Sequence, residues 1–208
     1  GARVHLCRIS SAAGVELVRQ AKAAGLAVSC DVSINSLHLT DVDIGYFDSR
    51  ARLTPPLRQQ RDRDAIRAAL GDGTVDALVS DHTPVDEDAK TLPSAEAEPG
   101  ATGLELLLSL ALKWAEDSGD AAKALPRALA VVTSAPAQVL GSALGTLQAS
   151  IGRLVEGGVA DLCVFDPQAR WTVQADTLRS QGKHTPFSGY ELPGQVRHTL
   201  VGGQVAFG

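Results

Sequence analysis

An aspartate and a histidine stand side by side at the end of a short apolar segment, VDALVSDHTPV, at residues 75–85. The apolar run predicts a buried strand that ends at Asp81 and His82, and Pro84 then turns the chain away. Carboxylate and imidazole groups at a strand end are typical of metal sites and acid–base pairs. The same pair also occurs as a hydrogen-bonded structural unit, so it needs further ligands before it indicates a metal.

Few other histidines can complete such a site, which for zinc requires three protein ligands at converging strand ends. Three of the five histidines are expected away from the end of this strand: His5, His184 and His198. Only His38 remains to join Asp81 and His82, and its position inside SLHLT favours a structural role. The local sequence therefore predicts no complete metal cage.

The three cysteines, Cys7, Cys30 and Cys163, are widely separated and odd in number. Each lies in or beside an apolar run, which predicts buried free thiols in a reducing compartment. His5 shares strand parity with Cys7, so both point to one side of the predicted strand. No Cys-x-x-Cys pair is present, so we expect no cysteine-based zinc site. A Cys–His nucleophile pair stays open, although thiols within apolar strands are usually inert.

Composition excludes several classes of protein. The 208 residues are 44% hydrophobic and 21% charged, with a net charge of −5, which is ordinary for a globular chain. This acidic balance argues against a nucleic-acid partner, which needs a basic face. No apolar run reaches the ~20 residues of a membrane span, and no signal-peptide pattern opens the chain, so we expect a cytoplasmic protein without membrane contact. Serine-hydrolase, P-loop and dinucleotide-binding motifs are absent.

Strand and helix patterns alternate through the first two-thirds of the chain. The predicted strands are 2–9, 26–33 and 75–81, and the predicted helices are 10–25, 61–73, 101–118 and two shorter ones within 124–141. Repeated strand–helix units imply parallel pairing with helical crossovers. Three such units are too few to close an eight-stranded barrel.

The pattern changes after Gly141. Short β segments are predicted at 144–150, 151–173 and 194–208, interrupted by Gly-Gly and Asp-Pro turns. The last segment reads as a hairpin with Gly202–Gly203 at its tip. Residues 86–100 are acidic and predict a mobile loop. The C-terminal region is therefore expected to be a small β appendage, part of a sandwich.

Eight segments resemble, in order, the motifs of class I dihydroorotases within the cyclic amidohydrolase superfamily. They are VHLCRISS, LAVSCDVSINSLHLTD, LTPPLRQQRDRDAI, VDALVSDHTPVDEDAK, EPGATGLELLLSLAL, TSAPAQVLG, GRLVEGGVADLCVFDP and HTPFSGYELPGQVRHTLVGGQVAF. Hydantoinases and allantoinases share the scaffold, but PPLR and PGATGLE are closer to dihydroorotases. The resemblance implies an α/β fold: the C-terminal part of a (β/α)8 TIM barrel at 1–144, about strands 5 to 8, and a β-sandwich subdomain segment at 145–208.

The departures from the family pattern fall at its functional positions. The resemblance places Arg8 at the zinc-binding histidine of the fifth strand, and Asn35 or Ser36 at that of the sixth. Asp81 keeps the proton-shuttle position beside His82. The positions implied for the substrate pocket are Thr54, Arg58, His82, Val85, Pro99 and Gly100. At two of these, Thr54 and Val85 replace the family's asparagine and histidine.

An arginine cannot replace a zinc ligand, because its pKa above about 12 keeps it charged and cationic. We therefore predict that Arg8 fills the vacated metal position and pairs with Asp81, and that this chain carries no metal cofactor where the active family uses zinc.

The resemblance then implies an inactive homologue in pyrimidine biosynthesis that is a structural or regulatory partner of aspartate transcarbamoylase, with a homo-oligomer left open. The alternative is an active zinc-dependent dihydroorotase or related cyclic amidohydrolase with an altered centre. A small-molecule sensor is a third alternative.

Overall fold

A parallel sheet forms the first half of the molecule, seen here in a computed structural model that describes residues 1–208. Its strands lie in the order β1 (Val4–Leu6), β2 (Val28–Ser33) and β3 (Ala77–Val79). Both pairings are parallel, as the strand–helix alternation predicts. The region around Thr54 forms no strand, so the sheet has three strands where the resemblance implies about four. The carboxyl ends of all three strands therefore meet at one edge.

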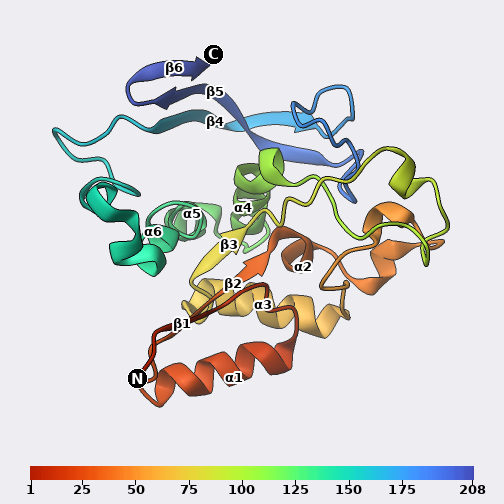
Figure 1. Cartoon of the computed structure of the whole chain (residues 1–208), viewed down its shortest axis with the longest axis horizontal. Coiled ribbons are helices and arrows are strands. Elements are labelled where there is room, and N and C mark those ends of the chain that lie inside the picture. The colour runs from red at the N-terminus through yellow and green to blue at the C-terminus, as the bar shows by residue number, and fades with distance from the viewer.

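Helices cover this sheet on both sides. They are α1 (Ala12–Ala23), α2 (Ile34–His38), α3 (Gln60–Asp72), α4 (Leu107–Glu116), α5 (Ala121–Ala130) and α6 (Ser134–Leu140). Figure 1 shows α1 and α3 below the strands and α4 and α5 above them. Helix α1 begins where its N-cap Ser11 accepts a hydrogen bond from the Gly14 amide, and the chain leaves it through Gly25 at a φ of 74°.

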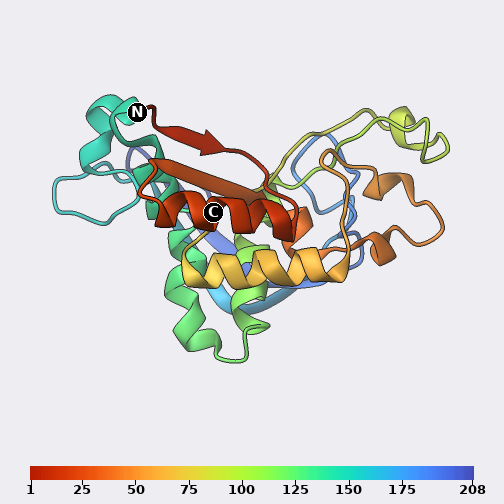
Figure 2. The same cartoon turned by 90° about the horizontal axis from the view of Figure 1, so that it is seen from below.

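Five short 3-10 helices complete the connections: η1 (Asp41–Ile44), η2 (Ser49–Ala51), η3 (Asp88–Lys90), η4 (Leu104–Leu106) and η5 (Gly141–Ala149). The loops that carry η1 to η3 lie side by side beyond the carboxyl ends of the strands (Figure 2). The loop at 86–100, predicted to be mobile, is anchored here: the buried Lys90 ammonium donates hydrogen bonds to the carbonyls of Ser49 and Arg52.

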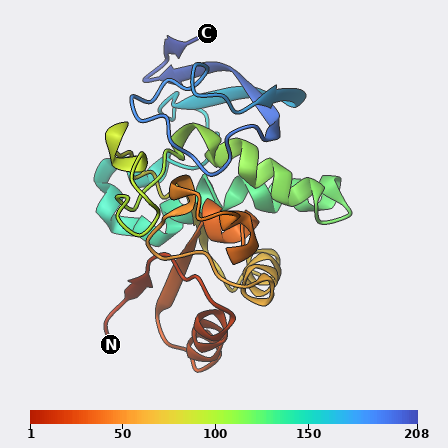
Figure 3. The same cartoon turned by 90° about the vertical axis from the view of Figure 1, so that its right-hand side faces the viewer.

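The C-terminal region forms a second, antiparallel sheet of β4 (Leu162–Thr172), β5 (Glu191–Val201) and β6 (Gln204–Phe207). The predicted hairpin is confirmed, with Gly202–Gly203 between β5 and β6. Figure 3 shows this sheet stacked on α4. The C-terminal region contains only this one three-stranded sheet, and a sandwich needs two, so the expected sandwich is not confirmed.

One hydrophobic core joins both sheets. It contains 27 buried residues from α1 to β5. The largest fully buried side chains include Ile66 and Leu70 of α3, Leu110 of α4, and Phe187 and Leu192 from the C-terminal region. Residues on both sides of the predicted 144/145 boundary therefore share one core, and η5 crosses that boundary.

Two β predictions are wrong in detail. Residues 144–150, expected as a strand, lie largely in η5, because LGTLQAS follows two helices and finds no strand partner. The Asp166–Pro167 pair, expected as a turn between strands, lies within β4. Asp166 Oδ1 accepts the amides of Gln168 and Ala169, and the ladder shifts register here, so the chain bulges without leaving the sheet.

Residues Ala121–Ala149 together reach the length and, with a mean hydropathy of 1.4, the apolarity of a membrane-spanning helix. In the structure they are divided among α5, α6 and η5. Gly141 and Gly145 take φ values of 53° and 56°, which interrupt the helical path. The stretch therefore does not form one continuous helix of spanning length.

Candidate functional site

An ion pair joins the ends of β1 and β3. Arg8 Nη1 lies 3.2 Å from Asp81 Oδ1, and it also donates a hydrogen bond of 3.0 Å to the Thr54 carbonyl. The Asp81 side chain is 9% exposed and that of Arg8 is 44% exposed. The predicted Arg8–Asp81 pair is thus confirmed, and one guanidinium connects three segments that are far apart in the sequence.

Both partners of this pair occupy a left-handed backbone conformation. Arg8 has a φ of 56° and Asp81 a φ of 50°, and only one other residue that is not glycine, Phe47, has a positive φ. Such conformations cost about 1–3 kcal/mol each and concentrate at functional sites. The Arg8 amide also donates to Asp31 Oδ1 at 2.7 Å, which holds the turn that follows β1.

The two residues at the positions implied for the sixth-strand ligand are buried. Asn35 and Ser36 belong to the short helix α2 and are 4% and 7% exposed. The helix begins at the end of β2, where the Asn35 amide donates to Ser33 Oγ. Neither residue type is a usual zinc ligand.

His82 supports the loop that leads into α4. Its Nδ1 accepts hydrogen bonds from the amides of Gly103 and Leu104, at 3.2 and 3.3 Å. This bonding requires Nδ1 to be unprotonated and leaves the proton of a neutral ring on Nε2. His82 therefore has a structural task at this strand end.

The other predicted pocket positions are scattered around the same edge. Gly100 is buried at a φ of 146°, and a Cβ there would collide with the Thr83 carbonyl oxygen. Val85 is half-buried and lines a pocket with Lys183 and His184. Three more are exposed or make backbone contacts only: Thr54, Arg58 and Pro99. The main surface pockets do not include Arg8 or Asp81.

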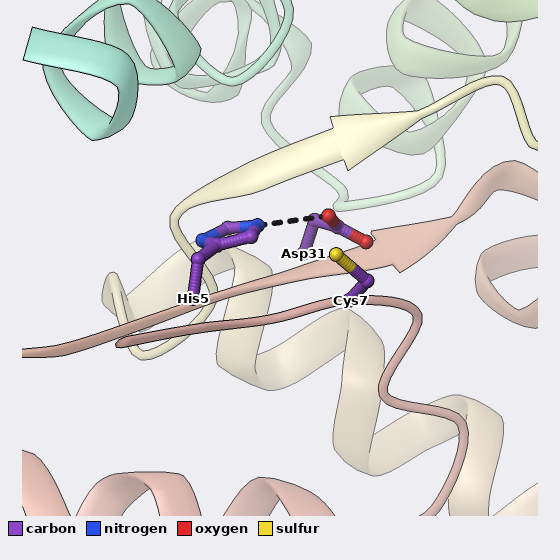
Figure 4. Close-up of side chains that lie close together, drawn as sticks. All are labelled: His5, Cys7 and Asp31. Atoms are coloured by element: carbon purple, nitrogen blue, oxygen red, sulfur yellow. Dashed lines mark hydrogen bonds and ion pairs between the residues drawn. The ribbon is translucent and has the colours of Figure 1, made fainter. Parts of the chain in front are cut away.

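A second polar cluster, which the sequence did not predict, lies along β1 and β2. One ligand atom each from His5, Cys7 and Asp31 fall within 4.8 Å of one another, and Figure 4 shows the three side chains converging. His5 Nε2 is 2.9 Å from Asp31 Oδ2. The shared parity of His5 and Cys7 was visible, but Asp31, the one carboxylate in β2 and a buried one, is the signal that completes the cluster.

All three cysteines are free thiols, as predicted, but only Cys30 has the predicted burial. Its thiol is buried, and burial raises its pKa to about 11. Cys7 and Cys163 are exposed, because β1 is an edge strand and Cys163 lies on the open face of β4.

The structural role predicted for His38 is supported. Its Nε2–H donates to the Leu110 carbonyl at 2.8 Å, and burial, assisted by the Arg67 charge, lowers its pKa to about 3.

Parallel strands with polar side chains at their carboxyl edge are the arrangement that α/β enzymes use for their sites. The amidohydrolase family matches residues 1–207, and the chain belongs to that family. It is 43% identical over 205 residues to a dihydroorotase-like protein of Pseudomonas aeruginosa, covering 99% of this chain and 46% of that protein. It is 38% identical to a dihydroorotase of Geobacter metallireducens, at 98% and 46% coverage. The chain thus spans about half the length of these curated relatives.

Solved structures agree with this fold. An L-hydantoinase (dihydropyrimidinase) from Arthrobacter aurescens superposes with a TM-score of 0.88 at 29% identity, over 99% of this chain and 45% of that one. A D-hydantoinase from Thermus sp. gives a TM-score of 0.85 at 24% identity, over 97% and 44%.

Zinc, which the family resemblance implies, does not fit the corresponding residues of this chain. A cationic guanidinium lies 3.2 Å from the one carboxylate that remains, and it repels a divalent ion. The buried Asn35 and Ser36 supply no replacement donor of the kind zinc prefers. At these positions the arrangement pairs Asp81 with a cationic side chain.

Proposed function

We propose that this protein is a dihydroorotase-like homologue of pyrimidine metabolism that lacks hydrolytic activity at the family's metal centre. In this proposal it is a cytoplasmic structural or regulatory partner of aspartate transcarbamoylase, without nucleic-acid or membrane contacts. One observation is the main support for the proposed loss of activity. The Arg8 guanidinium lies between Asp81 and the Thr54 carbonyl, at the position implied for a zinc ligand. The partnership rests on the resemblance to family members that lost their metal ligands.

Several features support a retained scaffold with altered chemistry. The turns at Arg8 and Asp81 keep costly left-handed conformations, and the loop at Gly100–Gly103 still packs against the end of β3. Substitutions that merely accumulated at random would not concentrate at the positions where the resemblance implies ligands and substrate contacts. A protein kept for its surface retains its fold and can lose its reaction.

Dihydroorotate hydrolysis tests the loss of activity. We expect no turnover by the purified full-length protein, with or without added zinc. The double variant Arg8→His/Asn35→His is the informative comparison, because it returns imidazoles to both implied ligand positions. Turnover by the unmodified protein that disappears in Asp81→Asn would overturn the proposal.

Co-purification with aspartate transcarbamoylase from the same cells tests the partnership. We expect a stable complex in size-exclusion chromatography, and an assembly that is unchanged by Asp81→Asn, because the Asp81 side chain is only 9% exposed and offers little surface to a partner. A transcarbamoylase that reaches its full assembly and activity in cells lacking this protein would contradict the proposed partnership.

An active cyclic amidohydrolase with an altered centre is the second candidate. The retained Asp81, whose side chain is only 9% exposed at the end of β3, favours it. That candidate requires metal and turnover together, and it requires both to depend on Asp81. Elemental analysis alongside the hydrolysis assay separates the two functions.

A further inference from the structure

The cluster of His5, Cys7 and Asp31 has the donor set of a transition-metal site. It offers one imidazole nitrogen, one sulfur and one carboxylate oxygen, all within 4.8 Å of one another. Zinc accepts these three ligand types with bonds of about 2.0–2.3 Å, and its open sites use three protein ligands and a water.

Supporting hydrogen bonds already orient two of the three donors. His5 Nδ1 lies 2.8 Å from Ser29 Oγ, and Asp31 Oδ1 accepts the Arg8 amide at 2.7 Å. Ligands of bound metals usually have such second contacts, which fix the ring tautomer and the carboxylate orientation. The remaining atoms, His5 Nε2 and Asp31 Oδ2, face each other at 2.9 Å.

A neutral His5 ring satisfies both contacts when Nδ1 accepts from the Ser29 hydroxyl and Nε2–H donates to Asp31 Oδ2. A metal ion at Nε2 takes the place of that proton, and Nδ1–H then donates to Ser29 Oγ. With neutral His5, a Cys7 thiolate and the Asp31 carboxylate carry two negative charges, which match a divalent ion. The exposed Cys7 gives such an ion access from solvent.

This cluster is separate from the Arg8–Asp81 pair. Its side chains come from β1 and β2 and from the residue directly after β1, whereas Asp81 follows β3. The Arg8 side chain bonds to Asp81 and Thr54, and only its backbone amide contacts Asp31. The guanidinium is therefore committed elsewhere.

We propose that His5, Cys7 and Asp31 bind one thiophilic divalent metal ion, represented by zinc, that clamps the short edge strand β1 to β2. The site lies among residues other than the family's implied ligands. Its existence does not depend on whether the protein is a hydrolase.

Cobalt and zinc titrations of the purified protein test the site. We expect a near-ultraviolet thiolate-to-cobalt band, competed by zinc, and a higher melting temperature with zinc but not with magnesium. Cys7→Ser should abolish the band and the zinc-dependent shift. Ser29→Ala, which removes the contact to His5 Nδ1, should weaken zinc binding by roughly 10-fold to 100-fold.

Cys163→Ser is the matched control, because Cys163 is also an exposed thiol but lies on the antiparallel sheet. It should retain the band, as should Asp81→Asn. Circular dichroism confirms that each variant is folded, and His5→Gln provides a second ligand variant. A band that survives Cys7→Ser, the absence of any band, or metal lost through Asp81→Asn would each overturn the proposal. Absence of dihydroorotate turnover leaves this test unaffected.

Discussion

The two edges of the parallel sheet differ in what surrounds their polar residues. At the end of β3, His82 bonds to the loop before α4, and Gly103 lies directly against the Ser80 carbonyl. Along β1, by contrast, Cys7 is exposed and the strand pairs on one side only, with β2. The end of β3 is therefore held by contacts to the loop before α4, whereas β1 is more open to solvent.

This difference bears on three of the positions that the family resemblance singles out: Arg8, Asp81 and His82. Asp81 and His82 persist at the packed end, where replacement would disturb several hydrogen bonds at once. Arg8 stands at the open edge, where the resemblance implies a ligand, and its long side chain reaches Asp81. The other departures, at the buried Asn35 and Ser36 and at Val85 beyond β3, lie away from this edge.

The largest effect on stability is expected at the packed end, for Gly103→Ala. The added Cβ would overlap the Ser80 carbonyl oxygen and press against Ile34. We expect a loss of about 3 kcal/mol in the free energy of unfolding, because backbone on both sides cannot yield. Urea denaturation measures it.

Gly71→Ala provides the control. A Cβ at Gly71, within α3, meets only Trp114 at an ordinary 3.6 Å, so helix propensity should make this variant equal to or more stable than the original by up to about 1 kcal/mol. Equal losses in both variants would contradict the close packing of Gly103 against the end of β3.

The next largest effect is a pH dependence caused by His38. Burial lowers its pKa to about 3, while the unfolded chain takes up that proton near pH 6.5. The unfolded state therefore binds more protons between these values, and stability falls as the pH drops through this window. From pH 7 to pH 5 we expect a loss of about 2 kcal/mol from this group.

Denaturation curves at both pH values measure this loss in the original protein and in His38→Gln, which keeps an N–H donor for the Leu110 carbonyl. The glutamine variant should lose about 2 kcal/mol less on acidification. His198→Gln, at an exposed position, should behave like the original protein. A His38→Gln variant with unchanged pH dependence would show that His38 is protonated in the fold.

The Arg8–Asp81 ion pair, which connects the ends of β1 and β3, is expected to contribute less to stability. Arg8→Met keeps an aliphatic side chain but removes the charge beside Asp81. Since the guanidinium is 44% exposed, water screens the pair, and we expect a loss of about 1 kcal/mol or less. A double-mutant cycle with Asp81→Asn isolates the coupling, which should weaken with added salt. Zero coupling at low salt would contradict the pairing.

Much of the fold was predictable because local signals agree with tertiary packing. The Ser11 cap, the apolar face of α3 and the Gly202–Gly203 turn each specify their element locally. Residues 144–150 were misassigned because their alternating pattern is weak and strand identity depends on a partner strand. The bulge at Asp166 likewise depends on pairing with β5.

The candidate site was predictable in part. A fixed positive charge at Arg8 and a carboxylate at Asp81 could be paired from the family order of motifs and from charge alone. The cluster of His5, Cys7 and Asp31 could not, because it depends on the register of β1 against β2, in which Leu6 pairs with Cys30. Register determines which side chains of adjacent strands meet, and no local pattern specifies it here.

The reactivity of the three thiols compares exposed positions with the core, and it needs no destabilising substitution. Cys7 and Cys163 should react with a thiol reagent in the native protein, whereas Cys30 should react only on unfolding. Raising its pKa from 9.0 to about 11 alone leaves Cys30 about 100-fold less thiolate. Zinc should slow Cys7 and not Cys163, because only Cys7 has His5 and Asp31 beside it. Equal protection of both exposed thiols would mean that zinc acts on cysteines in general, and the open edge would then hold no specific site.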